Sequence, residues 1–193
     1  MNICVYGASS TKLCDDFISE GEKLGEAMGN HGFGLVFGGG ANGMMGAAAR
    51  GVHKAGRTDI IGVAPSFFNV DGILYEHCTE FIYPDNMRDR KKKMEELSDA
   101  FIITPGGIGT MDEFFEILTL KQLGRHNKPI AIFNINGFYN SLQSYFVRSL
   151  EENIIRKDCD KLVFVSDNCE EILNYIENYK PESFSAEKLK PIH

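Results

Sequence analysis

The sequence has little positive charge and few cysteines. Its 20 Lys and Arg residues are outnumbered by 27 Asp and Glu residues, which gives a formal net charge of −7 over 193 residues. A protein that coats nucleic acid needs a basic face, so we expect no nucleic-acid partner. The five cysteines are odd in number and contain no CxxC pair. They are therefore expected to form neither a zinc site nor a disulfide framework.

Long apolar runs are also missing. No window holds about 18 uncharged apolar residues, and the first residues, MNICVYGASS, lack the basic segment of a signal peptide. We therefore expect a reduced, cytoplasmic protein without a membrane partner. The length fits one domain over residues 1–180, able to bury about 70% of the surface of its open chain. From Pro181 onward the chain is polar and aperiodic, which is typical of a loose C-terminal tail over 181–193.

Short apolar runs alternate with longer helical patterns along the chain. Uninterrupted apolar runs of four or five residues are typical of parallel strands covered on both faces. The predicted strands are 3–6, 35–37, 60–64, 100–104, 130–133 and 162–166. The predicted helices are one that includes Leu13 to Met28, followed by 44–56, 87–98, 111–123, 139–151 and 170–179. Repeated strand–helix alternation predicts an α/β fold, a doubly wound and mainly parallel Rossmann-like sheet with helices on both faces.

In such a sheet, ligands bind outside the carboxyl ends of the strands. Four turns follow predicted strands there, and they span residues 7–10, 38–43, 65–68 and 105–110. The turn 38–43, GGGANG, matches the GxGxxG pattern of dinucleotide sites. However, it follows the second strand, and the acidic residue about 20 positions later, Asp59, precedes its strand. A tight turn, or contact with another ligand, is therefore favoured over a dinucleotide site.

The turn 105–110, PGGIGT, is more informative. Glycines leave backbone N–H groups bare at the start of a helix, where the helix dipole also favours an anion. No Gly-Lys-Ser/Thr sequence follows, so this is not a Walker A loop. The turn therefore predicts a small phosphate ligand such as a nucleoside monophosphate.

Two charged residues near this turn have structural as well as functional interpretations. Thr110 to Glu113 matches a capping box, in which Glu113 folds back onto Thr110; catalysis is the alternative. Arg90 falls within the apolar stripe of its predicted helix, between Met87 and Met94. A guanidinium directed inward needs an anion, which is either a buried carboxylate or a ligand phosphate.

The helix predicted from Met111 has apolar residues on two sides. Phe114 and Leu118 lie on one side, while Leu120 and Leu123 share the other side with acidic residues. Burial all round is therefore expected, with a second subunit covering the second side. This pattern predicts a homodimer.

Two linked motifs carry a resemblance to a known family. MRDRK at 87–91 precedes PGGIGTMDE, and Glu113 lies 23 positions after Arg90. This arrangement resembles the LOG ("Lonely Guy") family, the cytokinin-activating phosphoribohydrolases often mislabelled as lysine decarboxylases, over about residues 1–180. The resemblance implies a usually dimeric, doubly wound fold. It also implies hydrolysis of the N-glycosidic bond of a nucleoside 5′-monophosphate, without metal or organic cofactor, to a free base and ribose 5-phosphate.

The resemblance also implies roles for individual residues. Arg90 and Glu113 correspond to the catalytic pair. The substrate-binding positions are implied to be Gly39, Met87, Lys91, Gly106, Gly107, Gly109, Thr110, Asp112 and Thr119. The chain departs from the family pattern at Arg88, where His is common, at Thr104, and at Gly72, where an acidic residue is often used. The last two positions concern the base, so AMP itself is the expected substrate, with an N6-substituted AMP as the variant.

Two other functions fit the same fold. A non-catalytic nucleotide carrier or sensor has no need for both Arg90 and Glu113. A lysine decarboxylase needs a lysine in a recognisable pyridoxal-phosphate setting, and the sequence offers none.

Overall fold

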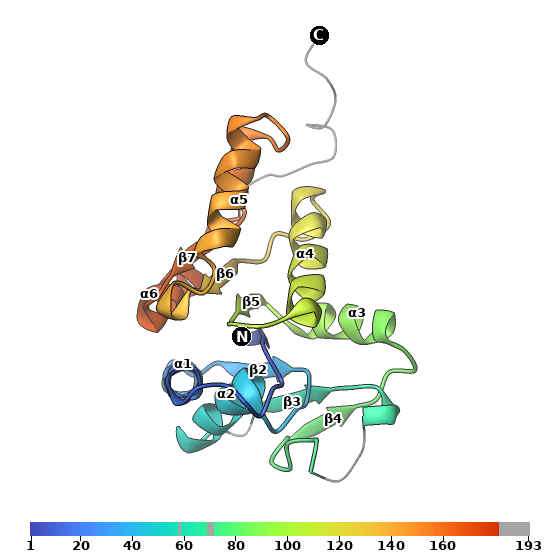
Figure 1. Ribbon diagram of the computed structural model, residues 1–193. Helices are drawn as coiled ribbons and strands as arrows, with labels where there is room; N and C mark the ends of the chain where they lie inside the picture. The colour runs from blue at the N-terminus through green and yellow to red at the C-terminus, as the bar shows by residue number, and fades with distance from the viewer. Residues whose placement is uncertain (58, 69–71, 182–193) are drawn as a thin grey trace.

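A seven-stranded parallel sheet forms the centre of the computed structural model, which describes residues 1–57, 59–68 and 72–181 (Figure 1). The strand order is β4-β3-β2-β1-β5-β6-β7, and each neighbouring pair is parallel. The predicted doubly wound α/β fold is confirmed. The strands are β1 (Asn2–Tyr6), β2 (Gly34–Phe37), β3 (Ile60–Val63), β4 (Glu80–Ile82), β5 (Ala100–Ile103), β6 (Ile130–Phe133) and β7 (Phe164–Ser166).

Six α-helices and three 3₁₀ turns connect the strands in the described part of the chain. The helices are α1 (Asp15–Asn30), α2 (Gly43–Lys54), α3 (Met87–Leu97), α4 (Ile108–Gln122), α5 (Asn140–Glu151) and α6 (Cys169–Glu177). The 3₁₀ turns are η1 (Ser66–Phe68), η2 (Ile135–Gly137) and η3 (Lys157–Lys161). None of these described helices combines the length and the apolar character that crossing a bilayer requires.

The helices cover both faces of the sheet, because alternate strand residues point to opposite faces. Ile3 and Val5 of β1 pack into a core with α1, α2 and α6, whereas Cys4 and Tyr6 pack into a second core with α3, α4 and α5. All four of these β1 side chains are buried. Burial on both faces explains why the central strands read as uninterrupted apolar runs.

The strand order reverses direction next to β1. Ile3 lies opposite Leu35 of β2 on one side and opposite Ala100 of β5 on the other. The chain winds outward in one direction through β2, β3 and β4, and in the other through β5, β6 and β7. The crevice at the carboxyl ends of β1 and β5 is therefore the switch point at which open α/β sheets bind ligands.

The structure corrects several expected boundaries. Strand β4 was not predicted, because its three residues, Glu-Phe-Ile, are short, partly polar and at the edge of the sheet. Strand β7 begins at Phe164 rather than at residue 162. Helix α4 begins at Ile108 rather than at Met111, because Gly107 is its N-cap. The tail expected over 181–193 lies, apart from Pro181, outside the described residues.

Candidate active site

A cavity of about 490 Å³ opens at the carboxyl edge of the sheet. All four turns named from the sequence contribute to it, through residues 7–10, Gly38 and Gly40, Phe68, and residues 107–110. Its volume lies within the range of roughly 300–1,000 Å³ that is typical of small-molecule sites. The cavity therefore lies where strands meet helices, at the edge of the sheet that the sequence indicated.

The glycine loop, defined here as residues 104–109, leads from β5 into α4. The first hydrogen bond within the helix runs from the Met111 N–H to the Gly107 carbonyl, at 3.0 Å. The N–H groups of Ile108, Gly109 and Thr110 therefore have no acceptor within the helix. They point out of the helix start beside the cavity that these residues line. Unpaired N–H groups at the positive end of a helix dipole form a ready anion-binding site.

The capping-box interpretation of Glu113 is wrong. Because Gly107 is the N-cap, Thr110 is already the third residue of α4 and Glu113 lies in the second turn. The Glu113 carboxylate is instead directed toward Arg90 of α3, and the Nη1–Oε1 distance is 2.5 Å. The motif matched the sequence pattern of a cap, but the glycine ahead of it allows the helix to begin one turn earlier.

Arg90 is held in the interior by helix α3. Asn86 caps that helix, since its side-chain oxygen accepts from the N–H groups of Arg88 and Asp89, each at 3.0 Å. One turn later Arg90 points inward and is only 7% exposed. Its Nε donates to the carbonyl of Val63 at the end of β3, at 3.0 Å. The sequence left two partners open for Arg90, a buried carboxylate or a ligand phosphate. The structure supplies the carboxylate of Glu113, and this ion pair also lines the cavity.

Burial changes the proton affinity of the acid in this pair. Desolvation raises the pKa of Glu113, while the charge and the hydrogen bond of Arg90 oppose that rise. A carboxylate that is buried, paired with a cation and placed at the wall of a cavity is suited either to accept a proton or to stabilise a developing positive charge.

The glycine-rich turn 38–43 serves the chain rather than a dinucleotide. A side chain at Gly38 would collide with the Arg90 guanidinium, so this glycine makes room for the buried arginine. The Ala41 N–H donates to the Ile73 carbonyl at 2.8 Å, and the Gly39 carbonyl accepts from the Tyr75 N–H at 2.9 Å. Asp59 lies before β3, at the opposite edge of the sheet. The tight-turn interpretation therefore fits.

Of the eleven predicted site residues, seven line the cavity. They are Met87, Arg90, Gly107, Gly109, Thr110, Asp112 and Glu113. Gly106 lies just outside the lining, and a side chain there would collide with Thr110. Gly39 adopts a positive φ of 77°, and a side chain there would collide with the Phe81 ring, so the position requires glycine.

Lys91 and Thr119 are not among the described residues that line the cavity. The Lys91 ammonium pairs with Asp112, at 2.9 Å, and with Glu116, so its charge links α3 to α4. Thr119 lies on the outer face of α4, in a shallow groove with Met111, Phe115 and other residues of that helix. The structure therefore shows neither residue in a position to contact a ligand in this cavity.

Some apolar residues at the cavity were not named from the sequence. Met45 of α2 and Ile73 and Leu74 of the segment before β4 line it, as does Phe68. Phe68 falls within a turn that the strand pattern indicated. The segment around Ile73 gave no such signal, because it reaches the cavity only by pairing with the turn 38–43.

Nothing in the described residues suggests a metal centre. No group of three or more His, Cys, Asp or Glu side chains there lies close enough together to hold a metal ion. The polar groups at the cavity, namely the N–H groups of α4 and the Arg90–Glu113 pair, are suited to an anionic organic ligand.

Comparisons with known proteins show the family to which the chain belongs. Residues 45–176 match the family model described as "Possible lysine decarboxylase". The chain is 34% identical, over 93% of its length and 82% of the relative's, to cytokinin riboside 5′-monophosphate phosphoribohydrolase LOG7 of Arabidopsis thaliana. It is also 34% identical to the LOG phosphoribohydrolase of Oryza sativa subsp. japonica, over 93% of its own length and 74% of the relative's.

A solved structure with the same fold is named as a carrier instead of a hydrolase. The Moco carrier protein of Chlamydomonas reinhardtii superposes with a TM-score of 0.68 at 22% identity, covering 91% of this chain and 94% of that one. At this identity the likeness shows the fold alone.

Proposed function

Because this chain belongs to the LOG family, we propose that it hydrolyses the N-glycosidic bond of a nucleoside 5′-monophosphate. The products are a free base and ribose 5-phosphate. The observation that carries the proposal is the buried Arg90–Glu113 pair in the wall of a cavity that also receives the N–H groups of α4.

The 5′-phosphate is assigned to the start of α4. The N–H groups of Ile108, Gly109 and Thr110 supply donors there, and the helix dipole adds positive potential. Glu113 follows one turn later on the same helix. A ribose whose phosphate is held at the helix start would therefore bring its C1′ carbon toward the Glu113 carboxylate.

The reaction needs a negative group beside the sugar. As the C1′–N bond breaks, its electron pair goes to the base and positive charge builds on the ribose. Glu113 stabilises that charge or takes a proton from the water that attacks C1′, and its raised pKa favours proton transfer. Arg90 orients the carboxylate through the 2.5 Å contact. Binding energy from the phosphate then lowers the barrier at C1′.

The base is expected to be adenine, with or without an N6 group. Phe68, Ile73 and Met45 provide apolar walls against which a purine can stack. The names of the curated relatives favour an N6-substituted AMP, a cytokinin riboside 5′-monophosphate. Gly72, which replaces the acid that the family often uses, lies close to this part of the chain, so we expect AMP to be accepted as well.

A carrier function is the second candidate, favoured by the name of the structural neighbour. A pure carrier gains nothing from burying a carboxylate against an arginine at the wall of its cavity, because desolvating that pair costs free energy. Decarboxylation of lysine through a Schiff base has less support. None of the described residues that line the cavity is a lysine, and Lys91 is already paired with two carboxylates.

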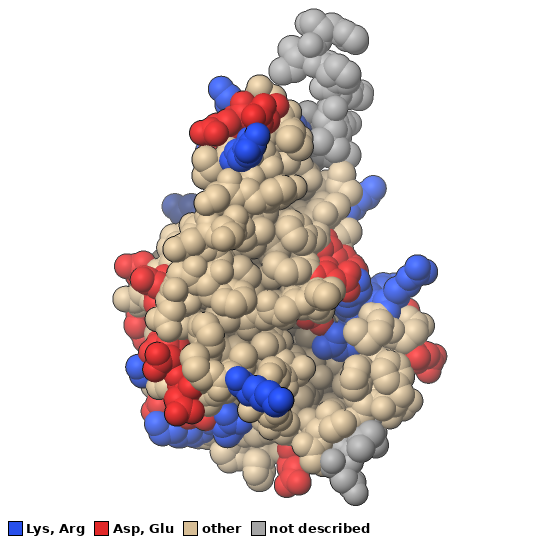
Figure 2. Space-filling model, in the orientation of Figure 1, with Lys and Arg blue, Asp and Glu red and all other residues tan. Residues whose placement is uncertain are grey.

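We also propose that the protein forms a homodimer through the outer face of α4. Ile108 is 92% exposed and Phe115 is 40% exposed, and both line the shallow groove along this helix. The groove shares Ile108 and Asp112 with the cavity, so a second copy would lie next to the substrate. Figure 2 shows mainly uncharged side chains across the middle of this face, between a charged cluster at the upper end of α5 and another beside α4 and α3.

The activity is tested by incubating the purified protein with AMP and measuring free adenine and ribose 5-phosphate. Equal amounts of the two products are expected. Binding of AMP without release of adenine would favour the carrier function instead. A panel of nucleoside monophosphates, including N6-substituted AMP, identifies the preferred base. Light scattering that gives a stable 21.5 kDa species at micromolar concentration would contradict the dimer.

A further inference from the structure

The glycine loop has almost no side chains with which to hold its own shape. Pro105 is followed by Gly106 and Gly107, and glycine loses more conformational freedom on folding than any other residue. Donors that bind a phosphate tightly must nevertheless be fixed before the ligand arrives. Hydrogen bonds from neighbouring elements are therefore needed to fix this loop.

One set of hydrogen bonds comes from β1 and the turn that follows it. The Thr104 N–H donates to the Tyr6 carbonyl at 2.8 Å, and the Ala8 N–H donates to the Pro105 carbonyl at 3.0 Å. These bonds fasten the loop on the side of the sheet centre. They leave the Thr104 carbonyl and the Gly106 N–H to be satisfied from the other side.

A single hydroxyl faces both of those groups. The Tyr139 O–H donates to the Thr104 carbonyl at 2.8 Å, and the Gly106 backbone acts on the same oxygen by opposing the rise in the pKa of the phenol. Tyr139 is only 4% exposed. Burial raises the pKa of this phenol, so it keeps its proton and remains a donor. The hydroxyl therefore bridges the two sides of Pro105.

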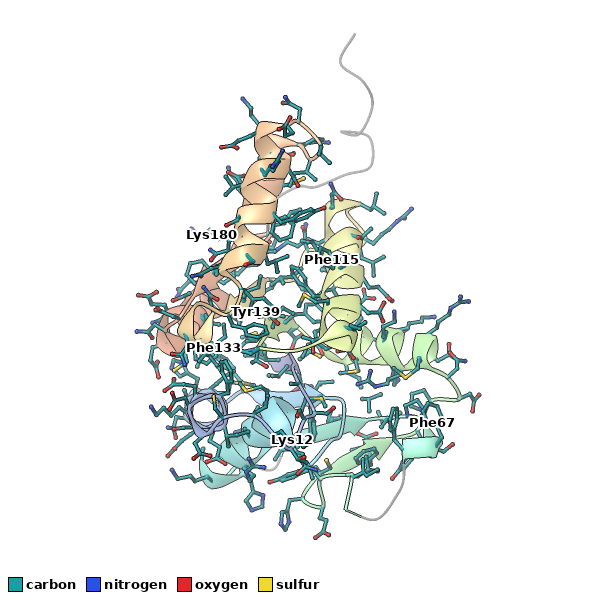
Figure 3. The ribbon with its side chains drawn as sticks, in the orientation of Figure 1. Lys12, Phe67, Phe115, Phe133, Tyr139 and Lys180 are labelled. Carbon is teal, nitrogen blue, oxygen red and sulfur yellow. The ribbon has the colours of Figure 1, made fainter. Side chains whose placement is uncertain are left out.

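The tyrosine is itself fixed by the turn between β6 and α5. Its backbone N–H donates to Asn134 Oδ1 at 2.7 Å. Asn136 and Gly137 take positive φ angles of 53° and 71°, which turn the chain back toward the sheet. Figure 3 shows Tyr139 at the base of α5, where the helix meets the sheet.

We propose that Tyr139 is a positioning residue whose hydroxyl fixes the glycine loop in its phosphate-binding conformation. Tyr139 is not among the described residues that line the cavity, so it acts through the loop rather than on the substrate. The inference rests on the proposed function in taking this loop as the phosphate subsite. It adds that phosphate affinity depends on a helix, α5, that contributes nothing else to the described cavity.

The test is the substitution Tyr139→Phe, which keeps the ring and removes the hydroxyl. Calorimetry measures the affinity for ribose 5-phosphate, and kinetics measure kcat and KM for AMP and for adenosine. We expect ribose 5-phosphate affinity to fall about 10-fold and the KM for AMP to rise by a similar factor. The kcat/KM for adenosine should stay within about twofold.

The matched control is Ser149→Ala. Ser149 also lies on α5, is 3% exposed, and donates its hydroxyl to the Tyr145 carbonyl at 2.8 Å. This hydrogen bond does not involve the glycine loop. Its loss should change stability about as much as Tyr139→Phe does, with no change in ribose 5-phosphate affinity. If Tyr139→Phe fails to fold, Asn134→Ala removes the acceptor for the Tyr139 N–H and should give the same phosphate-specific loss.

The outcomes separate this inference from the proposed function. Unchanged ribose 5-phosphate affinity in a folded Tyr139→Phe protein overturns the inference, whether or not AMP is hydrolysed. Equal losses for AMP and adenosine also overturn it, because they indicate general loosening. A wild-type protein that does not bind ribose 5-phosphate overturns the loop assignment and the inference with it. A phosphate-specific loss in a protein that releases no adenine supports the positioning role and rejects the reaction.

Discussion

Two glycine-rich turns follow strands β2 and β5 at the same end of the sheet, yet they have different roles. In the turn 38–43, the backbone pairs with residues 73–75, and Gly38 makes room for Arg90. In the glycine loop, side chains added at Gly107 or Gly109 would meet no atom within 4 Å, and the N–H groups beside them have no acceptor within the helix. A glycine pattern therefore predicts a ligand only where the chain leaves its N–H groups unused.

The largest effect is expected from Glu113→Gln, which tests whether the chemistry belongs to the helix that the glycine loop begins. The amide keeps the shape and the contact with Arg90, but it loses the negative charge and the basicity. We expect a folded protein that binds AMP and whose turnover falls at least about 100-fold. Turnover is measured by adenine release.

The matched control for this change is Glu116→Gln. Glu116 lies on the same helix but is directed toward Lys91 instead of the cavity. It should keep turnover within about threefold, since a partly exposed ion pair that does not line the cavity contributes little. Near-normal turnover of Glu113→Gln would reduce the Arg90–Glu113 pair to a structural ion pair and would remove the proposed active site.

Removal of the substrate's phosphate tests the glycine loop directly. Adenosine leaves the N–H groups of Ile108, Gly109 and Thr110 without the anion, and each hydrogen bond to a charged group that is lost costs about 1.5–3 kcal/mol. The kcat/KM for adenosine should therefore be at least about 100-fold below that for AMP. Similar values for the two substrates would show that the loop is an ordinary helix start, no different in function from the turn 38–43.

Alanine substitutions in the two turns should affect different kinetic parameters. At Gly38, the new methyl group collides with the Arg90 guanidinium, so kcat should fall about 10- to 100-fold as the ion pair is displaced. At Gly109, the methyl group enters open space beside the cavity. Stability should be unchanged or up to about 1 kcal/mol higher, since alanine is the better helix former. The KM for AMP should rise about 10-fold instead. The opposite pattern would reverse the two assignments.

The sheet and most of the helices could be predicted from the sequence because they depend on local patterns. Central strands such as Ile130–Phe133 are buried on both faces, and their apolar runs record this directly. Strand β4 could not be found this way, because Glu80 is exposed at the sheet edge and the strand depends on pairing with β3. Edge pairing is a tertiary property.

The site shows the same division between local pattern and tertiary contact. The inward direction of Arg90 follows from its position in an apolar stripe, and the structure confirms its burial. The capping box failed because two local signals competed, and Gly107 started the helix before Thr110. Lys91, to which the resemblance assigns a ligand contact, pairs with Asp112 and Glu116 on another helix. No spacing within a single helix could indicate that pairing.

The smallest expected effect concerns helix α4. Its two ends differ in the same way as the two glycine-rich turns. Its start leaves N–H groups for a ligand, whereas its last turns are closed by the chain itself. His126 Nε2 lies 2.8 Å from the Ile117 carbonyl, and His126 Nδ1 accepts from the Lys128 N–H at 3.2 Å. Such an imidazole is neutral, and burial lowers its pKa from 6.5 to about 4. The histidine thus ties the segment after α4 to the helix, and both of its contacts require the neutral ring.

The sign of the pH effect follows from that lowered pKa. The unfolded chain binds the proton near pH 6.5 and the folded chain only near pH 4, so stability is lost as the pH falls through this window. Because the ring is partly exposed, solvent screening reduces the effect, and we expect a loss of about 1–2 kcal/mol between pH 7.5 and pH 5. Urea unfolding of wild type and His126→Gln at both pH values measures it, and the difference between the two proteins cancels the contribution of other titrating groups. His77→Gln, at an exposed position, is the matched control and should keep the wild-type pH dependence. If His126→Gln also kept the wild-type pH dependence, the neutral histidine would not stabilise the end of α4, which would then depend on its backbone hydrogen bonds alone.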